Sequence, residues 1–356
     1  MLDVDKLENN SQSVGFCEAY LHAEPKYRLI LGRNEYAKDI ADLIEVGSFI
    51  DDYTDEAEFL GKPVIKSKDI PLDALVVSTL LGRPLAGEKK LQEVGVRHLD
   101  YFAFYENSSL DLPLVRFWGG FKEEFNNNRE KFLWVESLLA DDESRSTYEN
   151  IISFRLSGNL EYMKGFTDRQ QYQYFENFLD LTKNNEVFVD VGGYDGFTSE
   201  EFIKRCPEYR AVYLFEPDVK NIIVARSRLE RYPNVHLMQM GLSSHKETLG
   251  FSSGGSVSAI TEDGDIEIQV NALDELVDDA ITFIKMDIEG AESMAIAGAR
   301  NTILKNYPRL AICVYHKDAD FWKIPEQVFS IRNDYDIYLR HYTEGVAETV
   351  MFFIPK

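Results

Sequence analysis

The chain has few cysteines and few histidines, and these shortages exclude some kinds of site. Its three cysteines, Cys17, Cys206 and Cys313, are far apart and form no C-x-x-C pair. We therefore expect reduced thiols and no disulfide framework. The six histidines are equally scattered, so their spacing predicts no zinc site.

Positive charge and long apolar runs are also scarce. Acidic residues outnumber lysine and arginine by 61 to 38, and the net charge is −23. Because proteins bind nucleic acid largely by neutralising phosphates, this charge argues against a nucleic-acid substrate. No apolar run reaches the roughly 18 residues of a membrane span, and the first residues are acidic rather than basic. We expect a cytoplasmic protein without a membrane span or secretion signal.

The length of 356 residues, of which 44% are hydrophobic, predicts two domains with separate cores. The polar stretch near residue 141 suggests the boundary. It divides the chain into residues 1–140, a small Rossmann-like α/β domain with a helical connector, and residues 141–356, a second α/β domain.

Strands and helices alternate in the first domain. We predict strands over residues 27–31, 48–52, 61–65 and 74–79 and near 101–104, with helices over 35–45 and 89–93. The order of Gly32, Phe-Ile-Asp-Asp, Gly-Lys-Pro-Val-Ile and Asp-Ala-Leu-Val-Val resembles the nucleotide-sugar-binding domain of bacterial sugar O-acyltransferases. The turn after Gly32 has no further glycine, so we expect a structural or substrate-presenting role. Helices are predicted from about residue 110 to 183, including one over 169–181.

The most informative stretch is residues 186–196, Glu-Val-Phe-Val-Asp-Val-Gly-Gly-Tyr-Asp-Gly. It predicts a buried parallel strand that turns sharply into a helix, where open α/β sheets bind nucleotide-like ligands. Gly192, Gly193 and Gly196 do not follow the G-x-G-x-x-G pattern of dinucleotide-binding loops. Asp190, at the strand tip, would repel a diphosphate but could hold an ammonium group.

A second strand, residues 211–215, ends at Glu216, 20 residues after Gly196. A carboxylate at this place can accept both ribose hydroxyls. An amino acid joined to a nucleoside without phosphate describes S-adenosylmethionine, and the two motifs resemble those of Rossmann-like methyltransferases. In that fold the loop after the third strand, here residues 235–239, usually lies against the adenine, which implies Gly241 and Leu242. The polar residues 252–256 form either a lid or a hairpin tip.

The strand over residues 281–286 leads into Asp287 and Glu289, and alternation places both on one face with Lys285. The two acids could bind a substrate hydroxyl, accept its proton or hold a divalent cation such as magnesium. Alternatively, Lys285 pairs with a carboxylate and only organises the strand end. A further strand, residues 310–315, brings His316 to the same edge, as a general base or as an imidazole bonded to a carbonyl.

From about residue 150 to the end, the motifs resemble FkbM-family methyltransferases. They are Val-Asp-Val-Gly-Gly-Tyr-Asp-Gly-Phe-Thr-Ser, Phe-Glu-Pro-Asp, Leu-Asp-Glu-Leu, Ile-Lys-Met-Asp-Ile-Glu-Gly-Ala-Glu and Val-Tyr-His-Lys, in that order. The resemblance implies a Rossmann-like fold with S-adenosylmethionine as methyl donor. It places Asp190, the three glycines and Glu216 at the cofactor, and Asp287, Glu289 and His316 at the acceptor.

We therefore expect an O-methyltransferase that acts on a hydroxyl of a sugar, nucleotide sugar or related small metabolite. The alternatives are a non-catalytic module that binds S-adenosylmethionine or a nucleotide sugar, and a nicotinamide-dependent oxidoreductase that uses the first domain. Magnesium dependence and homo-oligomer formation remain open at this point.

Overall fold

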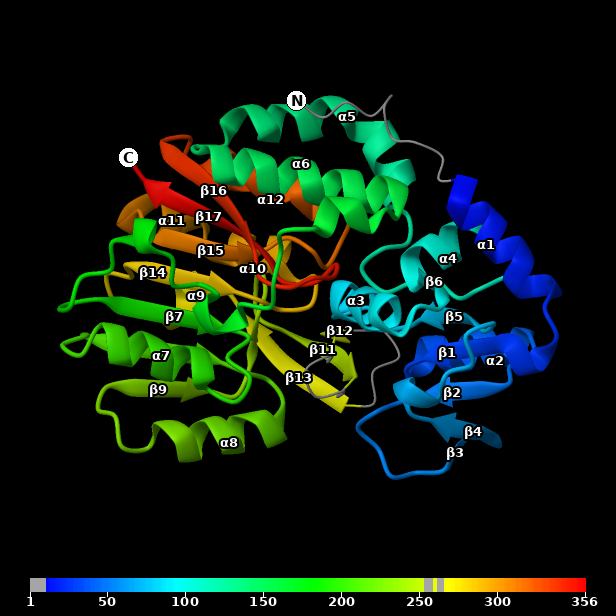
Figure 1. The fold of residues 1–356 in the computed structure, drawn as a ribbon. Coiled ribbons are helices and arrows are strands. Elements are labelled where there is room, and N and C mark those ends of the chain that lie inside the picture. The colour runs from blue at the N-terminus through cyan, green and yellow to red at the C-terminus, as the bar shows by residue number, and fades with distance from the viewer. Residues whose placement is uncertain (1–10, 253–258, 261–265) are drawn as a thin grey trace. The chain divides into compact units, whose positions relative to one another are not determined.

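The computed structural model describes residues 11–252, 259–260 and 266–356, which divide into two compact units (Figure 1). Unit 1 comprises Met1–Asn126, Tyr148–Gln170 and Tyr342–Ala347, and unit 2 comprises Asn127–Thr147, Gln171–His341 and Glu348–Lys356. The sequence predicted one boundary near residue 141, whereas the chain passes between the two units several times. One cause is visible in unit 2, where Arg340 of a late strand pairs with Asp141 at 2.7 Å.

Unit 1 is built on a six-stranded sheet in the order β3-β4-β2-β1-β5-β6, which is parallel except for the pair β3 and β4. Its first elements are α1 (Ser11–His22), β1 (Arg28–Leu31), α2 (Glu35–Leu43), β2 (Ser48–Ile50), β3 (Glu58–Phe59), β4 (Lys62–Ile65), β5 (Leu75–Ser78), α3 (Pro84–Val94), β6 (Arg97–Asp100) and α4 (Tyr101–Asn107). The predicted small parallel sheet is confirmed.

The strand predicted near residues 101–104 is wrong. The strand ends at Asp100, whose carboxylate accepts a hydrogen bond from the Ala103 N–H and so starts the helix α4. Tyr101, Phe102 and Phe104 are all buried. A run of large apolar residues does not distinguish a buried strand from a short buried helix, and here the capping aspartate decides.

Two longer helices follow, α5 (Phe121–Leu138) and α6 (Asp142–Ser157). The helix predicted over residues 169–181 is also wrong, because only two single 3₁₀ turns form there, Gln170–Tyr172 and Asn177–Leu179. Tyr174 lies between them with a φ of 69°, a left-handed conformation that a continuing α-helix does not allow.

Unit 2 contains a seven-stranded sheet in the order β16-β17-β15-β14-β7-β8-β9, parallel except for β17. Its strands are β7 (Val187–Val191), β8 (Ala211–Phe215), β9 (Val235–Met238), β14 (Phe283–Met286), β15 (Arg309–Cys313), β16 (Tyr335–His341) and β17 (Thr349–Pro355). Because β7 is paired with β8 on one side and β14 on the other, the strand order reverses there. Ligands of open α/β sheets bind at such a reversal, beyond the carboxyl ends of the strands.

Helices connect these strands. In the sequence, α7 follows β7 and α8 follows β8 (Figure 1). The helices are α7 (Phe197–Arg205), α8 (Val219–Leu229), α9 (Leu273–Leu276), α10 (Glu292–Gly298), α11 (Arg300–Asn306) and α12 (Asp320–Ile331). Asp218 caps α8 as predicted, by accepting from the Lys220 and Asn221 N–H groups. The mixed α/β class predicted for the chain is confirmed.

A separate four-stranded sheet in the order β10-β13-β11-β12 completes the unit, from β10 (Gly241–Leu242), β11 (Glu247–Ser252), β12 (Ala259–Ile260) and β13 (Ile266–Asn271). The predicted lid or hairpin tip over residues 252–256 lies almost wholly outside the described residues. Within the described part of the chain, no helix has both the length and the apolar character needed to cross a membrane. The three cysteines are buried and form no disulfide.

Candidate active site

The glycine-rich turn follows β7, and packing explains two of its glycines. A Cβ on Gly192, whose φ is +75°, would lie 1.9 Å from the Asp287 carbonyl oxygen, and one on Gly193 would lie 2.2 Å from Cγ of Leu214. Both distances are far below van der Waals contact. The turn is therefore pressed against the ends of the two neighbouring strands, which places Asp287 beside it.

Asp190 lies at the end of β7 with no exposed surface. Its carboxylate is 3.2 Å from Lys285 Nζ and accepts a 2.7 Å hydrogen bond from Ser199 Oγ. Lys285 also donates to the Gly192 carbonyl at 2.6 Å. Burial alone would lower the pKa of Lys285, but the Asp190 and Asp287 carboxylates raise it. Asp190 thus supports the turn through Lys285. A pair between Lys285 and a carboxylate was the alternative predicted from the sequence, and in the structure that carboxylate is Asp190.

Glu216 follows β8 and bonds to the turn from the other side. Its Oε2 accepts from the Tyr194 N–H at 3.0 Å, and its Oε1 accepts from the Asp218 N–H at 2.9 Å and from Asn221 at 3.4 Å. Burial raises the pKa of this carboxyl, and the bound N–H groups oppose the rise. A carboxylate offers about four acceptor positions, so one remains for a ligand hydroxyl.

Asp287 comes directly after β14, which ends one residue earlier. Asp287 and Glu289 therefore lie outside the strand, where side chains need not alternate, and Glu289 has a left-handed φ of 55°. The Asp287 carboxylate accepts a 2.7 Å hydrogen bond from the Tyr174 hydroxyl. Burial acts to raise its pKa, but Lys285 and His316 lower it below the ordinary value. Asp287 is thus an ionised, half-buried acceptor with 23% of its side chain exposed.

His316 brings three acids together. Its Nε2 lies 3.4 Å from Asp287 and 3.7 Å from Glu289, and its Nδ1 lies 2.8 Å from Glu292. Burial acts to lower the pKa of His316, but these carboxylates raise it to about 9. Its side chain is 0% exposed, whereas that of Glu289 is 18% exposed. Of the three residues predicted at the acceptor, the two acids reach the surface and the histidine lies behind them.

Four residues of this network were not predicted from the sequence. Tyr174 bonds to Asp287, Glu292 holds His316, Gln173 donates to Glu348 at 2.6 Å, and Gln173 also donates to Tyr174 at 2.8 Å. Loss of water around Glu348 raises its pKa to about 7, and the Asp287 charge adds to the rise. Glu292 is the last residue of the motif Ile-Lys-Met-Asp-Ile-Glu-Gly-Ala-Glu, so the sequence could have indicated it. Gln173 and Glu348 carried no such signal.

Gly241 and Leu242 form β10, which belongs to the four-stranded sheet and not to the seven-stranded one. They pair in parallel with Val270 and Asn271 of β13, and Leu242 is buried. The structure gives them a packing role, and their contact with an adenine remains a prediction.

Among the residues that the structure describes, one group of side chains could hold a metal ion. Asp287, Glu292 and His316 each offer a ligand atom, and these atoms lie within 4.8 Å of one another. Glu292 Oε1 already accepts from the Ile288 N–H at 2.9 Å and faces His316 Nδ1. Glu292 is therefore better placed to orient the imidazole than to bind a cation itself.

A seven-stranded sheet with a glycine turn and an acid at its strand reversal defines a Rossmann-like ligand-binding unit. Residues 190–343 match the methyltransferase FkbM domain, and this stretch of the chain is a methyltransferase domain of the FkbM type. The resemblance predicted from the sequence motifs is confirmed.

Two of the proteins that are similar to this chain show the likeness in sequence and in fold. The 2-O-methyltransferase NoeI of Sinorhizobium fredii is 26% identical over 151 residues, which cover 35% of this chain and 62% of that protein. The crystal structure of methyltransferase FkbM from Methylobacillus flagellatus KT is 24% identical, with a TM-score of 0.76 over 97% of this chain and 98% of that one. The chain spans less than two thirds of the first relative, and the second shows that the fold is shared.

Proposed function

We propose that the protein is an S-adenosylmethionine-dependent O-methyltransferase that acts on a hydroxyl of a sugar or nucleotide sugar. One observation supports this most strongly: the glycine turn and the ionised Asp287 meet where the strand order reverses, with Gly192 against the Asp287 carbonyl. A cofactor on the turn and an acceptor at Asp287 would then be neighbours. The name of the Sinorhizobium relative, a 2-O-methyltransferase, supports an oxygen acceptor.

The residues at the turn fit this cofactor. Glu216 keeps an acceptor position for a ribose hydroxyl, and Asp190, Glu216 and Asp287 give the turn a negative environment that disfavours a diphosphate. When bound, S-adenosylmethionine supplies an electrophilic methyl group. The chain itself needs only to orient the acceptor oxygen and take up its proton.

Asp287 is the residue that we assign to the acceptor hydroxyl. Its carboxylate is ionised and partly exposed, and the Tyr174 hydroxyl and His316 hold it in place. Glu289 is also partly exposed and is the second contact. His316 is enclosed by three acids and orients them, so it acts behind the acceptor rather than on it.

Magnesium at the same acids is a variant of this mechanism. Activity that is lost on chelation and restored by magnesium supports it, whereas full activity in a chelator means that Asp287 and Glu289 bind the acceptor hydroxyl without a metal ion. Asp287 and Glu289 would be the ligands with open surface.

Calorimetry with S-adenosylhomocysteine tests the cofactor site. The purified protein should bind it, and Glu216→Ala should weaken binding about tenfold or more, because a hydrogen bond to a charged group is lost. Cys206→Ala, at a buried position without a role at the turn, is the control. Wild-type protein that does not bind, or equal affinity of both variants, would refute the assignment.

The acceptor is tested by methyl transfer to a panel of free sugars and nucleotide sugars. Transfer to a hydroxyl confirms the proposed class. Tight cofactor binding without transfer to any member would favour a non-catalytic binding module.

A further inference from the structure

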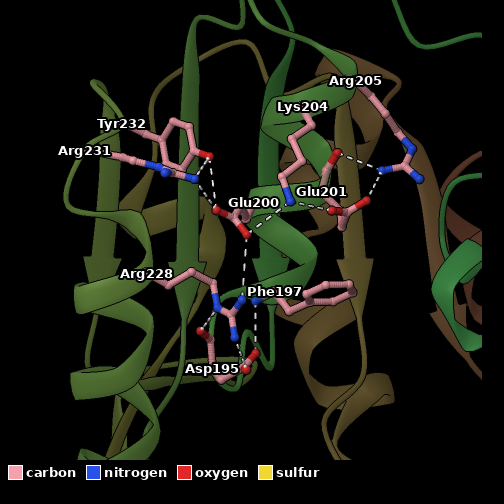
Figure 2. Close-up of polar contacts among 9 residues, drawn as sticks. All are labelled: Asp195, Phe197, Glu200, Glu201, Lys204, Arg205, Arg228, Arg231 and Tyr232. Atoms are coloured by element: carbon pink, nitrogen blue, oxygen red, sulfur yellow. Dashed lines mark hydrogen bonds and ion pairs between the residues drawn. The ribbon is translucent and has the colours of Figure 1, made fainter.

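One residue of the glycine turn is held by a helix that is not attached to it in sequence. Arg228 of α8 donates from Nε to the Asp195 carbonyl oxygen at 2.9 Å and from Nη2 to the Asp195 carboxylate at 2.5 Å (Figure 2). The other carboxylate oxygen of Asp195 accepts from the Phe197 N–H at 3.0 Å, at the start of α7. A single guanidinium thus grips both the backbone and the side chain of one turn residue.

The turn also packs directly on α8. Gly196 has a φ of +80°, and a Cβ there would lie 3.2 Å from Cα of Ala225 and 3.0 Å from Cδ1 of Leu229. Its neighbour Tyr194 has a left-handed φ of 46°. Non-glycine residues rarely adopt this conformation unless surrounding contacts impose it. Such contacts are present on both sides of the turn: Glu216 accepts from the Tyr194 N–H, and Arg228 holds the next residue, Asp195.

Behind Arg228 is a network of charged groups on α7 and directly after α8. Glu200 lies 3.7 Å from Arg228 Nη1, 2.9 Å from Arg231 and 3.2 Å from Lys204 (Figure 2). Arg231 shares Glu200 with Arg228 and bonds to Tyr232. It therefore matches Arg228 in charge and in its acidic neighbour, but its bonds are to Glu200 and Tyr232 instead of Asp195.

We propose that Arg228 is a positioning residue for the cofactor, which sets the backbone of residues 194–196 before S-adenosylmethionine binds. This inference rests on the proposed function. We call the two Arg228–Asp195 hydrogen bonds the clamp. Without the clamp the turn samples other conformations, so only a fraction of the protein is competent to bind and the apparent affinity falls by that fraction. The methyl-transfer step at saturating cofactor does not involve the guanidinium and keeps its rate.

Binding and kinetics of matched variants test the proposal. Arg228→Ala should raise the Kd for S-adenosylhomocysteine and the KM for S-adenosylmethionine about tenfold, with kcat within about twofold of wild type. Arg228→Lys should fall between, because an ammonium keeps one contact to the carboxylate but loses the fork. Arg231→Ala should bind as wild type does. Equal Kd values for Arg228→Ala and Arg231→Ala would overturn the proposal.

Hydrogen exchange provides a readout that does not depend on activity. The amides of residues 193–196 should exchange faster in Arg228→Ala than in Arg231→Ala or wild type, because the turn opens locally. Unchanged exchange there would refute the clamp even if affinity falls. If wild-type protein fails to bind S-adenosylhomocysteine, the proposed function fails and the cofactor role of Arg228 with it, whereas the exchange data still decide whether the clamp exists.

Discussion

Both units contain a parallel sheet whose strand order reverses at its first strand, yet the carboxyl edges of the two sheets differ in polar chemistry. In unit 1, Arg33 pairs with Asp51 at 2.8 Å and Lys90 pairs with Asp52, with each side chain between 20% and 32% exposed. In unit 2, Asp190 is fully buried with Lys285.

The remaining acids of the unit 2 edge show the same contrast. Asp287, Glu289 and Glu292 surround a single histidine, so carboxylates exceed cations there. The unit 1 acids are each matched by a cation, and such partly exposed pairs contribute little to stability and leave no group for a ligand. At the unit 2 edge Asp287 and Glu289 are about as exposed, but they and the buried Glu292 share one histidine, and carboxylates in excess are typical of sites that do chemistry. We therefore assign the proposed reaction to unit 2, although both sheets have the topology of a ligand-binding fold.

The sharpest way to break this comparison is to neutralise one acid at each edge. Asp287→Asn should lower kcat by about a hundredfold or more, because the variant loses the charge to which we assign orientation of the acceptor and uptake of its proton. Asp51→Asn, at the matching edge of unit 1, should change kcat by less than about twofold. Steady-state methyl transfer to a responsive acceptor measures both. A large loss in the unit 1 variant would show that its edge takes part in the reaction.

A second comparison removes one cation from each edge and measures stability. Lys285→Met should lower the free energy of unfolding by about 3–5 kcal/mol, because it leaves the charge of the buried Asp190 without its cation. Lys90→Met should cost less than about 1 kcal/mol, because its pair with Asp52 is 22–32% exposed. Urea denaturation provides both values. Equal losses would mean that burial does not distinguish the two pairs.

The smallest of the three effects concerns Glu348, whose pKa is raised to about 7 from the ordinary 4.5. The folded state then holds the proton more tightly than the unfolded chain. Its stabilising contribution is full below about pH 4.5 and is lost as the pH rises through about 7.

Glu348→Gln lacks this dependence and can still accept from Gln173. Its stability relative to wild type should therefore increase by up to about 3 kcal/mol between pH 4.5 and pH 8, as thermal unfolding across this range would show. The exposed Glu208→Gln is the control. A difference that does not vary with pH would contradict the raised pKa.

The sequence alone predicted the elements that depend on local patterns. The strand, glycine turn and acid of residues 187–196 were predicted because an apolar run before closely spaced glycines has few other structures. Asp218 was predicted as a helix cap for a similar local reason. The failures at Tyr101 and Tyr174 have one cause. Large aromatic residues fit strands, helices and turns equally well once they are buried, so their spacing did not identify the element.

Amino-acid order thus determined which residues end the strands, and with them Asp190, Glu216 and Asp287. Only the tertiary structure decided which of these are accessible: Asp190 lies beneath the turn on Lys285, while Asp287 keeps part of its carboxylate at the surface. It also decided the partners Tyr174, Glu348 and Arg228, which are 113, 61 and 33 residues away from the site residues that they approach or hold. Interactions over such separations depend on how the strands and helices pack, and local sequence carries no record of that packing.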